Sequence, residues 1–218
     1  MNWRYQNIVA TTLPNKISIS EIKRRYNAEE DNNTYNYSLI SAPSFLSEEF
    51  ESGTTYGTLM HETLQRIDFA NYSQEAVTKI IDLLTDDARI KNSIIGKISK
   101  FANTRLFNEI ASSKKIYREA AFNLNLKAEE LYDVEINENI MVQGIIDLYF
   151  ITQNDEIILV DYKTDNVQDE AELIKRYKIQ LELYKRALEE ILGKSVSKTI
   201  IYSFKLDKEI DILSCIDA

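Results

Sequence analysis

The amino-acid sequence predicts an α/β fold, in which a helical stretch is followed by strands, one long helix and a further strand. Three observations support this prediction. Between Tyr56 and Ser112, apolar residues recur at the spacing of three and four that marks helix faces. Over residues 116–162 the pattern changes to a period of two and to continuous apolar runs, as in strands. A long amphipathic pattern over 168–192 is typical of a helix, and a strand-like segment follows at 198–204.

The helical part of the chain is preceded by a strand. Lys16–Ile19 is strand-like and leads into a short helix that starts near Ser20 and runs to about Tyr26. Residues 28–52, rich in acidic residues, Tyr, Ser and Asn, are interpreted as an irregular connection. A helix is then expected over 56–68, and two or three more between Ser73 and Ser112.

The strand-rich part starts at residue 116. Alternating residues over 116–126, and β-branched runs over 140–151 and 156–162, predict three strands. The polar residues Gln153–Asp155 between the last two predict a hairpin, which would set these strands side by side. The following long helix is expected to end at Gly193, because glycine readily takes the left-handed conformation that terminates helices.

Composition restricts the class of protein. The chain has 218 residues, of which 44% are hydrophobic and 28% charged, as in an ordinary globular protein. A single cysteine, Cys215, excludes a disulfide framework, a four-cysteine zinc site and an iron–sulfur cluster held by this chain alone. No apolar run approaches the roughly 18 residues of a membrane helix, and the N-terminus has no apolar signal core. We therefore expect a soluble cytoplasmic protein.

The net charge of −9 argues against a free-standing nucleic-acid-binding protein, because such proteins are usually basic. Two interpretations still allow a nucleic-acid partner. Either the acidic residues are concentrated at a metal site, or the chain is a piece of a larger protein whose other parts hold the nucleic acid.

The strongest chemical signal is a pair of carboxylates on two apolar strands. Asp161 and Lys163 end the run 157–163, and a period of two places both on one face. Asp147 lies in the preceding apolar strand, which the predicted hairpin brings alongside. Buried charges are costly unless they are paired or bind a metal. Two carboxylates beside a lysine suit Mg²⁺ and an activated water molecule.

The same residues also have a purely structural interpretation. It consists of a buried Asp–Lys ion pair, with Asp147 bonded to backbone amides. A second acid-x-Lys match, Glu21–Ile22–Lys23, lies on a predicted surface helix, where a solvated face explains it. The context therefore favours residues 161–163 as the chemical site.

His61, the only histidine of the chain, lies on the helix expected over 56–68. Gln65 stands where a zinc protease of the His-Glu-x-x-His type needs its second histidine, so that class is excluded. A lone helical histidine is then either a metal ligand or an ordinary side chain, satisfied or exposed.

Gln180 and Tyr184, four residues apart, share one face of the predicted long helix. Polar side chains there could contact substrate phosphates or bases, and a tyrosine could stack on a base. The alternative is an amphipathic helix whose tyrosines, Tyr177 included, lie at the edge of the core.

Together, six segments resemble the RecB-like branch of the PD-(D/E)xK nuclease superfamily, and more narrowly the C-terminal nuclease domain of AddA-type (RexA-type) helicase–nuclease subunits. The segments are GTLMHETLQ (57–65), YREAAF (117–122), GIIDLYF (144–150), ILVDYKTD (158–165), YKIQLELYKRAL (177–188) and KISISEIKRR (16–25). The resemblance spans nearly the whole chain. It implies the restriction-endonuclease-like fold, a central mixed β-sheet flanked by helices.

The resemblance also implies roles for the matching residues. The implied metal ligands, for Mg²⁺ or Mn²⁺, are His61, Asp147, Asp161 and the backbone carbonyl of Tyr162. The implied catalytic residues are Asp147, Asp161, Lys163, Gln180 and Tyr184, with Lys163 as the catalytic lysine. Two departures from the family motifs are visible: Ile146 precedes Asp147, as is normal for this branch, and Ala121 stands where the Arg-Glu-x-Pro-Phe motif has proline. Because of the second departure, Glu119 is given no role.

The function implied by the resemblance is that of a Mg²⁺-dependent deoxyribonuclease, an exonuclease that hydrolyses DNA phosphodiester bonds in double-strand-break repair and recombination. The sequence contains no Gly-x-x-x-x-Gly-Lys-Ser/Thr phosphate-binding loop, so the ATP-driven motor is expected elsewhere in the same polypeptide. The expected partners are single-stranded DNA, that helicase portion and a second AddB-type subunit, with no membrane.

We expect residues 1–218 to form one nuclease domain, with a catalytic core at about 56–68 and 116–204 and a helical insertion at about 73–112. Two alternatives remain open. One is a catalytically silent nuclease-fold module for DNA binding or assembly, and the other is a free-standing RecB-like exonuclease or restriction-type enzyme.

Overall fold

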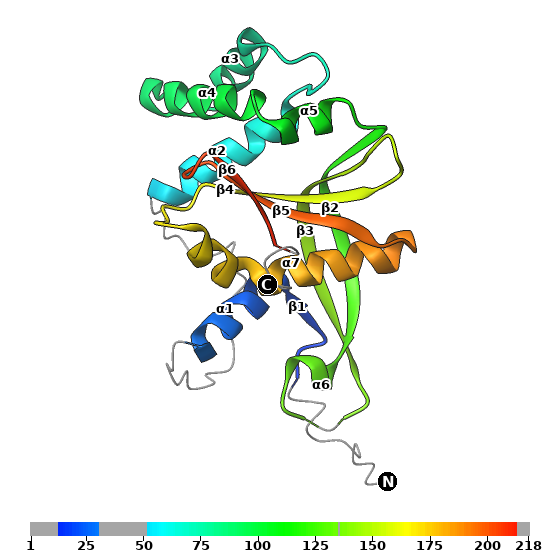
Figure 1. The fold of residues 1–218 in the computed structure, drawn as a ribbon. Helices are drawn as coiled ribbons and strands as arrows, with labels where there is room; N and C mark the ends of the chain where they lie inside the picture. The colour runs from blue at the N-terminus through cyan, green and yellow to red at the C-terminus, as the bar shows by residue number, and fades with distance from the viewer. Residues whose placement is uncertain (1–12, 31–51, 135, 213–218) are drawn as a thin grey trace, which may run out of the picture.

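A computed structural model describes residues 13–30, 52–134 and 136–212, which form a six-stranded mixed β-sheet flanked by helices (Figure 1). The strands are β1 (Lys16–Ser18), β2 (Lys115–Lys127), β3 (Asn139–Ile151), β4 (Ile157–Lys163), β5 (Val196–Ser203) and β6 (Lys208–Asp211). The helices are α1 (Ile19–Glu30), α2 (Ser52–Arg66), α3 (Gln74–Asp82), α4 (Ala88–Ala102), α5 (Arg105–Ala111), α6 (Ala128–Leu131) and α7 (Glu170–Leu192). The predicted α/β fold with a central mixed sheet is confirmed.

Strand β3 joins the two halves of the sheet. Its residues Met141–Gln143 pair in parallel with β1, and its residues Leu148–Ile151 pair antiparallel with β4, as the predicted hairpin requires. Along its other edge, β3 pairs antiparallel with nearly the whole of β2. Beyond β4, the sheet continues with the parallel strand β5 and the antiparallel strand β6. Residues 144–147 of β3 therefore lie at a fork, between the strand that ends and the strand that begins.

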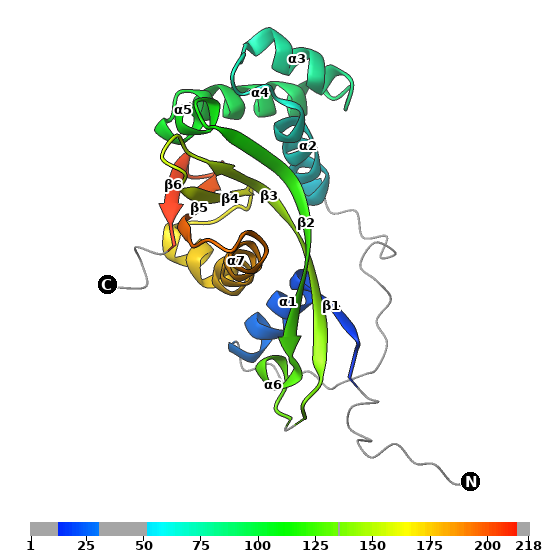
Figure 2. The ribbon, with the colours of Figure 1, turned by 90° about the vertical axis from the view of Figure 1, so that its right-hand side faces the viewer.

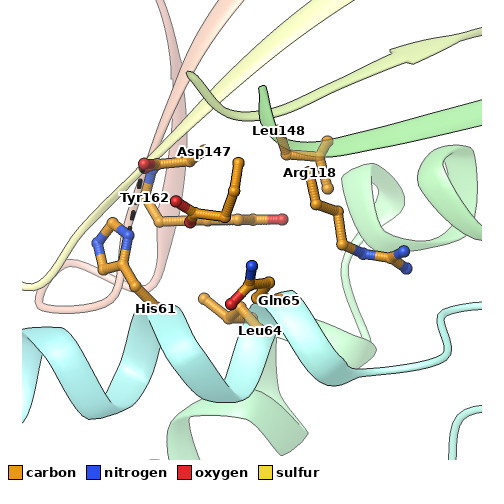
Figure 3. A pocket seen from close by; sticks show the side chains of 8 residues that line it. His61, Leu64, Gln65, Arg118, Asp147, Leu148 and Tyr162 are labelled. Carbon is orange, nitrogen blue, oxygen red and sulfur yellow. Dashed lines mark hydrogen bonds and ion pairs between the residues drawn. The ribbon is translucent and has the colours of Figure 1, made fainter. Parts of the chain in front are cut away.

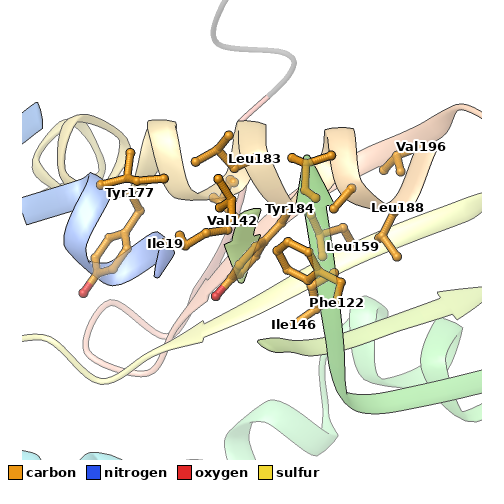
Figure 4. Close-up of a cluster of buried hydrophobic side chains, with 14 of the residues drawn as sticks. Ile19, Phe122, Val142, Ile146, Leu159, Tyr177, Leu183, Tyr184, Leu188 and Val196 are labelled. Atoms are coloured by element: carbon orange, nitrogen blue, oxygen red, sulfur yellow. The ribbon is translucent and has the colours of Figure 1, made fainter. Parts of the chain in front are cut away.

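The two faces of the sheet are covered by different helices. Helices α7 and α1 lie on one face, and α2 with the helices that follow it lies on the other (Figures 1 and 2). On the first face, Leu183, Tyr184 and Leu188 of α7 pack toward Leu159 and Phe122 (Figure 4). Strand β4 is buried on both faces, which explains its continuous apolar run.

Most of the predicted helices are confirmed, including three between Ser73 and Ser112. Their first turns are capped by side-chain oxygens of Ser73, Asp87 and Thr104, which accept hydrogen bonds from backbone N–H groups. Helix α7 begins after the cap residue Asp169. It ends at Gly193, whose φ of 62° lies in the left-handed region, as predicted.

Some boundaries differ from the expectation. Helix α1 continues to Glu30 and α2 already begins at Ser52, so the irregular connection expected over 28–52 is confined to 31–51, outside the described residues. Helix α6 and strand β6 are not predicted by the sequence pattern, because elements of four residues are too short to show a period. Among the described helices, none is both long and apolar enough to cross a membrane.

Candidate functional site

The end of β4 carries a buried ion pair. The Nζ atom of Lys163 lies 2.6 Å from Oδ2 of Asp161, so the two side chains share one face, as the period of two predicts. The Asp161 side chain is 1% exposed and that of Lys163 is 11% exposed. From α7, Nε2 of Gln180 donates a hydrogen bond to the other carboxylate oxygen, Oδ1, at 3.1 Å. Both oxygens of Asp161 are therefore held.

The surroundings shift the ionisation of this pair. Burial raises the pKa of Asp161 to about 6, with a further contribution from the charge of Asp147, although Lys163 opposes the shift. Burial lowers the pKa of Lys163, but the charges of Asp161 and Asp147 outweigh it, so the pKa lies above its usual value. A positively charged ammonium group is thus fixed beside the two carboxylates at neutral pH.

Asp147 lies at the fork of the sheet and contacts two elements. Its Oδ2 accepts a hydrogen bond from the backbone N–H of Tyr162 at 2.9 Å, and its Oδ1 lies 3.5 Å from Nδ1 of His61 on α2 (Figure 3). Burial lowers the pKa of His61, but the contact with Asp147 raises it above the usual value. Burial likewise raises the pKa of Asp147, but His61 and Lys163 bring it below the usual value.

Glu119 joins this group from β2, although the sequence motifs assign it no role. The ladder pairs Arg118 with Leu148 and Ala120 with Ile146, which places Glu119 opposite Asp147. The backbone φ of Glu119 is 47°, a conformation that costs energy for a residue with a Cβ. One ligand atom each from His61, Glu119 and Asp147 lies within 4.8 Å of the others. Burial and the charge of Asp147 raise the pKa of Glu119.

The three side chains border an open hollow of about 190 Å³ between α2 and the fork (Figure 3). Helix α2 can approach here because Gly57 lacks a side chain: a Cβ at this position would lie 3.1 Å from Oγ1 of Thr164. Arg118 secures the other end of α2, since its Nη2 donates to the carbonyl of Ile67 at 3.0 Å. These contacts bring His61, one turn after Gly57, to the carboxylates.

The tyrosines of α7 belong to the core. Tyr177 and Tyr184 are buried in the apolar cluster beneath α7, and the Tyr184 hydroxyl lies 3.4 Å from Nε2 of Gln180 (Figure 4). The idea that a tyrosine of this helix stacks on a base is therefore not supported, because neither ring is accessible. Gln180, by contrast, reaches the predicted site through Asp161.

The donor set suits a divalent metal ion. Carboxylate oxygens and imidazole nitrogen are ligands of Mg²⁺- and Mn²⁺-type ions, and Glu119, Asp147 and His61 supply both kinds. Both contacts of the purely structural interpretation are present too, namely the Asp161–Lys163 ion pair and the backbone hydrogen bond to Asp147. That interpretation leaves unexplained why a second carboxylate, in a strained backbone conformation, faces Asp147.

This fold and this site define a nuclease. The chain matches the PD-(D/E)XK nuclease superfamily over residues 25–211. It belongs to that superfamily, whose members use divalent metal ions.

Similar proteins are named as the first of the subunits of an ATP-dependent helicase/nuclease. Those of Clostridium novyi, Clostridium acetobutylicum and Acetivibrio thermocellus are 34%, 35% and 36% identical over 233, 225 and 222 residues. The matches cover 97%, 94% and 94% of this chain, but 18%, 18% and 17% of those proteins, so the chain spans less than a fifth of their length. The crystal structure of SSO0001 aligns with 88% of this chain and 76% of that one at 14% identity, with a TM-score of 0.36, which is too low to support an argument.

Proposed function

We propose that the chain is the nuclease part of an ATP-dependent helicase/nuclease and that it hydrolyses DNA phosphodiester bonds with Mg²⁺ or Mn²⁺ bound. The observation that carries this proposal is the position of the His61, Glu119 and Asp147 ligand atoms next to a buried, charged lysine. The names of the similar proteins support the link to a helicase.

The proposed metal ligands include His61 and Asp147, which lie in one group with Glu119. We retain Asp161 and the backbone carbonyl of Tyr162 as further ligands, because the resemblance implies them, and the Tyr162 N–H ties this segment to Asp147. Glu119 is added from the structure. The metal-binding measurement described in the Discussion separates these ligands.

Each proposed catalytic residue has a definite task. When bound, a divalent ion would polarise the scissile phosphate and make a water molecule more acidic. Lys163, held by Asp161, would donate a hydrogen bond to a phosphate oxygen as negative charge develops there. Gln180 keeps the Asp161 carboxylate in one orientation, and Tyr184 supports Gln180 from the core. The ammonium group is therefore preorganised before substrate binds.

The substrate and partners follow from the same proposal. The DNA would be a single strand supplied by the helicase portion of the polypeptide, and a second, AddB-type subunit would complete the enzyme. The basic surface that holds the DNA would then lie largely outside this acidic chain, whose net charge is −9. Residues 1–218 would act as one cytoplasmic nuclease domain, with α3–α5 as an insertion into it.

The test is the cleavage of end-labelled single-stranded DNA with Mg²⁺, with Mn²⁺ and with EDTA. Lys163→Ala should reduce the rate by at least about 10²-fold, the usual cost of losing one preorganised donor. The matched control is Lys114→Ala, which breaks an exposed ion pair of 2.8 Å with Asp155 and should leave the rate unchanged.

The outcomes distinguish the proposal from its alternatives. Metal-dependent cleavage that Lys163→Ala abolishes supports the nuclease and its site together. If the pure chain neither cuts DNA nor binds Mn²⁺, the proposal is wrong and the module without catalytic activity is favoured. Equal activity of the wild-type chain and Lys163→Ala would contradict the assigned site.

A further inference from the structure

A second lysine reaches the site from α1. The sequence pattern places Lys23 on a solvated helix face, and the structure corrects this, because Lys23 is partly buried. Its Nζ lies 3.8 Å from the centroid of the Tyr177 ring. The Nζ of Lys163 lies 4.5 Å from the same centroid. The two ammonium groups are therefore neighbours around one aromatic ring.

The carboxylates near Lys23 are engaged elsewhere. Glu21, on the same helix, lies 2.6 Å from Nη2 of Arg25. Asp165 is paired with Arg176 at 2.9 Å and accepts hydrogen bonds from the Tyr177 hydroxyl at 2.8 and 2.9 Å. Within the part of the chain that the structure describes, Lys23 forms no ion pair, and its ammonium group contacts the Tyr177 ring instead.

This arrangement lacks an anion. A partly buried ammonium group beside another ammonium group is unfavourable, and burial together with the charge of Lys163 lowers the pKa of Lys23 to about 8. The Tyr177 ring offsets part of this cost by a cation–π contact. An anionic group of a ligand, placed between or beside the two lysines, would neutralise both.

We propose that Lys23 binds a phosphate of the DNA strand that adjoins the phosphate cut beside Lys163. The inference rests on the proposed function and adds a substrate contact from α1. An ammonium group is a compact charge that suits phosphate oxygens without a fixed orientation. The phosphate is either an internal phosphodiester or the phosphate at a strand end, and both have the same chemistry.

The experiment measures equilibrium binding of a fluorescent single-stranded oligonucleotide to the 218-residue chain over a range of salt concentrations, in Ca²⁺ and with the oligonucleotide recovered intact. Lys23→Gln should bind several-fold more weakly at low salt. The slope of log affinity against log salt should become shallower by about 0.7, the value for one phosphate contact on a single strand. Lys23→Arg keeps the charge and should keep the slope.

The matched control is Arg24→Gln on the same helix, because the Arg24 side chain is 67% exposed and lies 3.9 Å from Glu21. It should leave the slope of the wild-type chain unchanged. Oligonucleotides with and without a 5′-phosphate identify the source: a defect of Lys23→Gln restricted to the phosphorylated strand indicates the strand end, and an equal defect on both indicates an internal phosphodiester.

Three results would overturn the inference. The first is a wild-type slope in Lys23→Gln, and the second is a loss in Arg24→Gln as large as that in Lys23→Gln. The third is a change in Lys23→Gln that is confined to thermal unfolding, as for a packing residue. Each of these leaves the proposed nuclease intact. A wild-type chain that binds no DNA at all would instead contradict the proposed function, and the Lys23 contact with it.

Discussion

The backbone N–H of Tyr162 donates a hydrogen bond to the Asp147 carboxylate, 2.9 Å away across the fork between β3 and β4. The last ladder pair of these strands is Leu148 with Val160, so the side chain of Asp147 continues the pairing where the main chain of β3 turns away. One oxygen is used for this contact, while the other lies toward His61. Asp147 therefore both secures the fork and supplies a charge to the site.

Asn at position 147 should separate these two tasks. Asp147→Asn keeps an oxygen that accepts the Tyr162 hydrogen bond but loses the charge, so we expect at least about tenfold weaker Mn²⁺ binding, as for other altered metal sites, with little change in thermal unfolding. Asp147→Ala loses both and should also unfold more easily. Isothermal titration calorimetry measures the affinity, with Asp155→Asn, in an exposed turn, as the control.

The same titration decides which further carboxylate binds the metal. Glu119→Gln should weaken Mn²⁺ binding if the group formed by His61, Glu119 and Asp147 holds the ion. Asp161→Asn should weaken it if the ligand set implied by the resemblance is correct. Unchanged affinity in Glu119→Gln would remove Glu119 from the site and leave its strained backbone without an explanation.

Removing Lys163 alone should destabilise the fold more than removing its partner as well. Lys163→Met leaves the carboxylate of Asp161, 1% exposed, without its cation, at an expected cost of about 3–5 kcal/mol in the free energy of unfolding. The double variant Asp161→Leu/Lys163→Met buries no charge there and should recover most of this loss. Urea unfolding measures both, and a double variant no more stable than the single one would contradict the expectation.

Lys23 should make the protein more stable as the pH rises above about 8. Its pKa is lowered from 10.5 to about 8 in the folded chain, by burial and Lys163, with a smaller contribution from Arg176, while Asp165 and Asp161 oppose the shift. Between these two pH values the unfolded chain binds more protons, so the free energy of unfolding increases with pH.

Lys23→Met lacks this contribution. The difference in unfolding free energy between the wild-type chain and this variant should therefore change in favour of the wild type as the pH is raised through that interval. Urea unfolding at a series of pH values measures it, and a difference that does not depend on pH would show that Lys23 is well solvated.

Two glycines should respond oppositely to alanine. A Cβ on Gly144 of β3 would lie 2.6 Å from the Phe122 ring, so Gly144→Ala should destabilise the protein by about 1–3 kcal/mol through overpacking. A Cβ on Gly96 of α4 meets no atom within 4 Å, so Gly96→Ala should stabilise the protein by about 0.5–1 kcal/mol. Thermal or urea unfolding of the two variants checks the signs, and destabilisation by Gly96→Ala would count against this account of α4.

Much of the fold could be predicted because its elements are long enough to show a period. The continuous apolar run of β4 identifies a strand that is buried on both faces, and the period of two identifies the side on which Asp161 and Lys163 meet. The hairpin signal at 153–155 correctly brings Asp147 toward them. These parts of the site depend on neighbours in the sequence.

The remaining parts depend on contacts between distant segments. Glu119 faces Asp147 only because of the register between β2 and β3, and a local pattern does not contain that register. The acidic residue next to Arg118 in YREAAF is the available signal, but the missing proline conceals it. The sequence pattern places Lys23 on a surface because it considers the helix alone, whereas packing of α1 near α7 sets Lys23 beside Tyr177.

The pairing of β1 with β3 affects the order in which the chain can fold. Lys16–Ser18 pair with Met141–Gln143, so the first strand has to wait until the chain has been synthesised through the middle of β3. Contacts over such sequence distances form slowly, because a large loop must close before they give any stabilisation. Helix α1 follows β1 directly, and Tyr177 lies later still. Lys23 can thus join Lys163 only near the end of folding, so a nascent or partly folded chain would carry an incomplete DNA-binding surface.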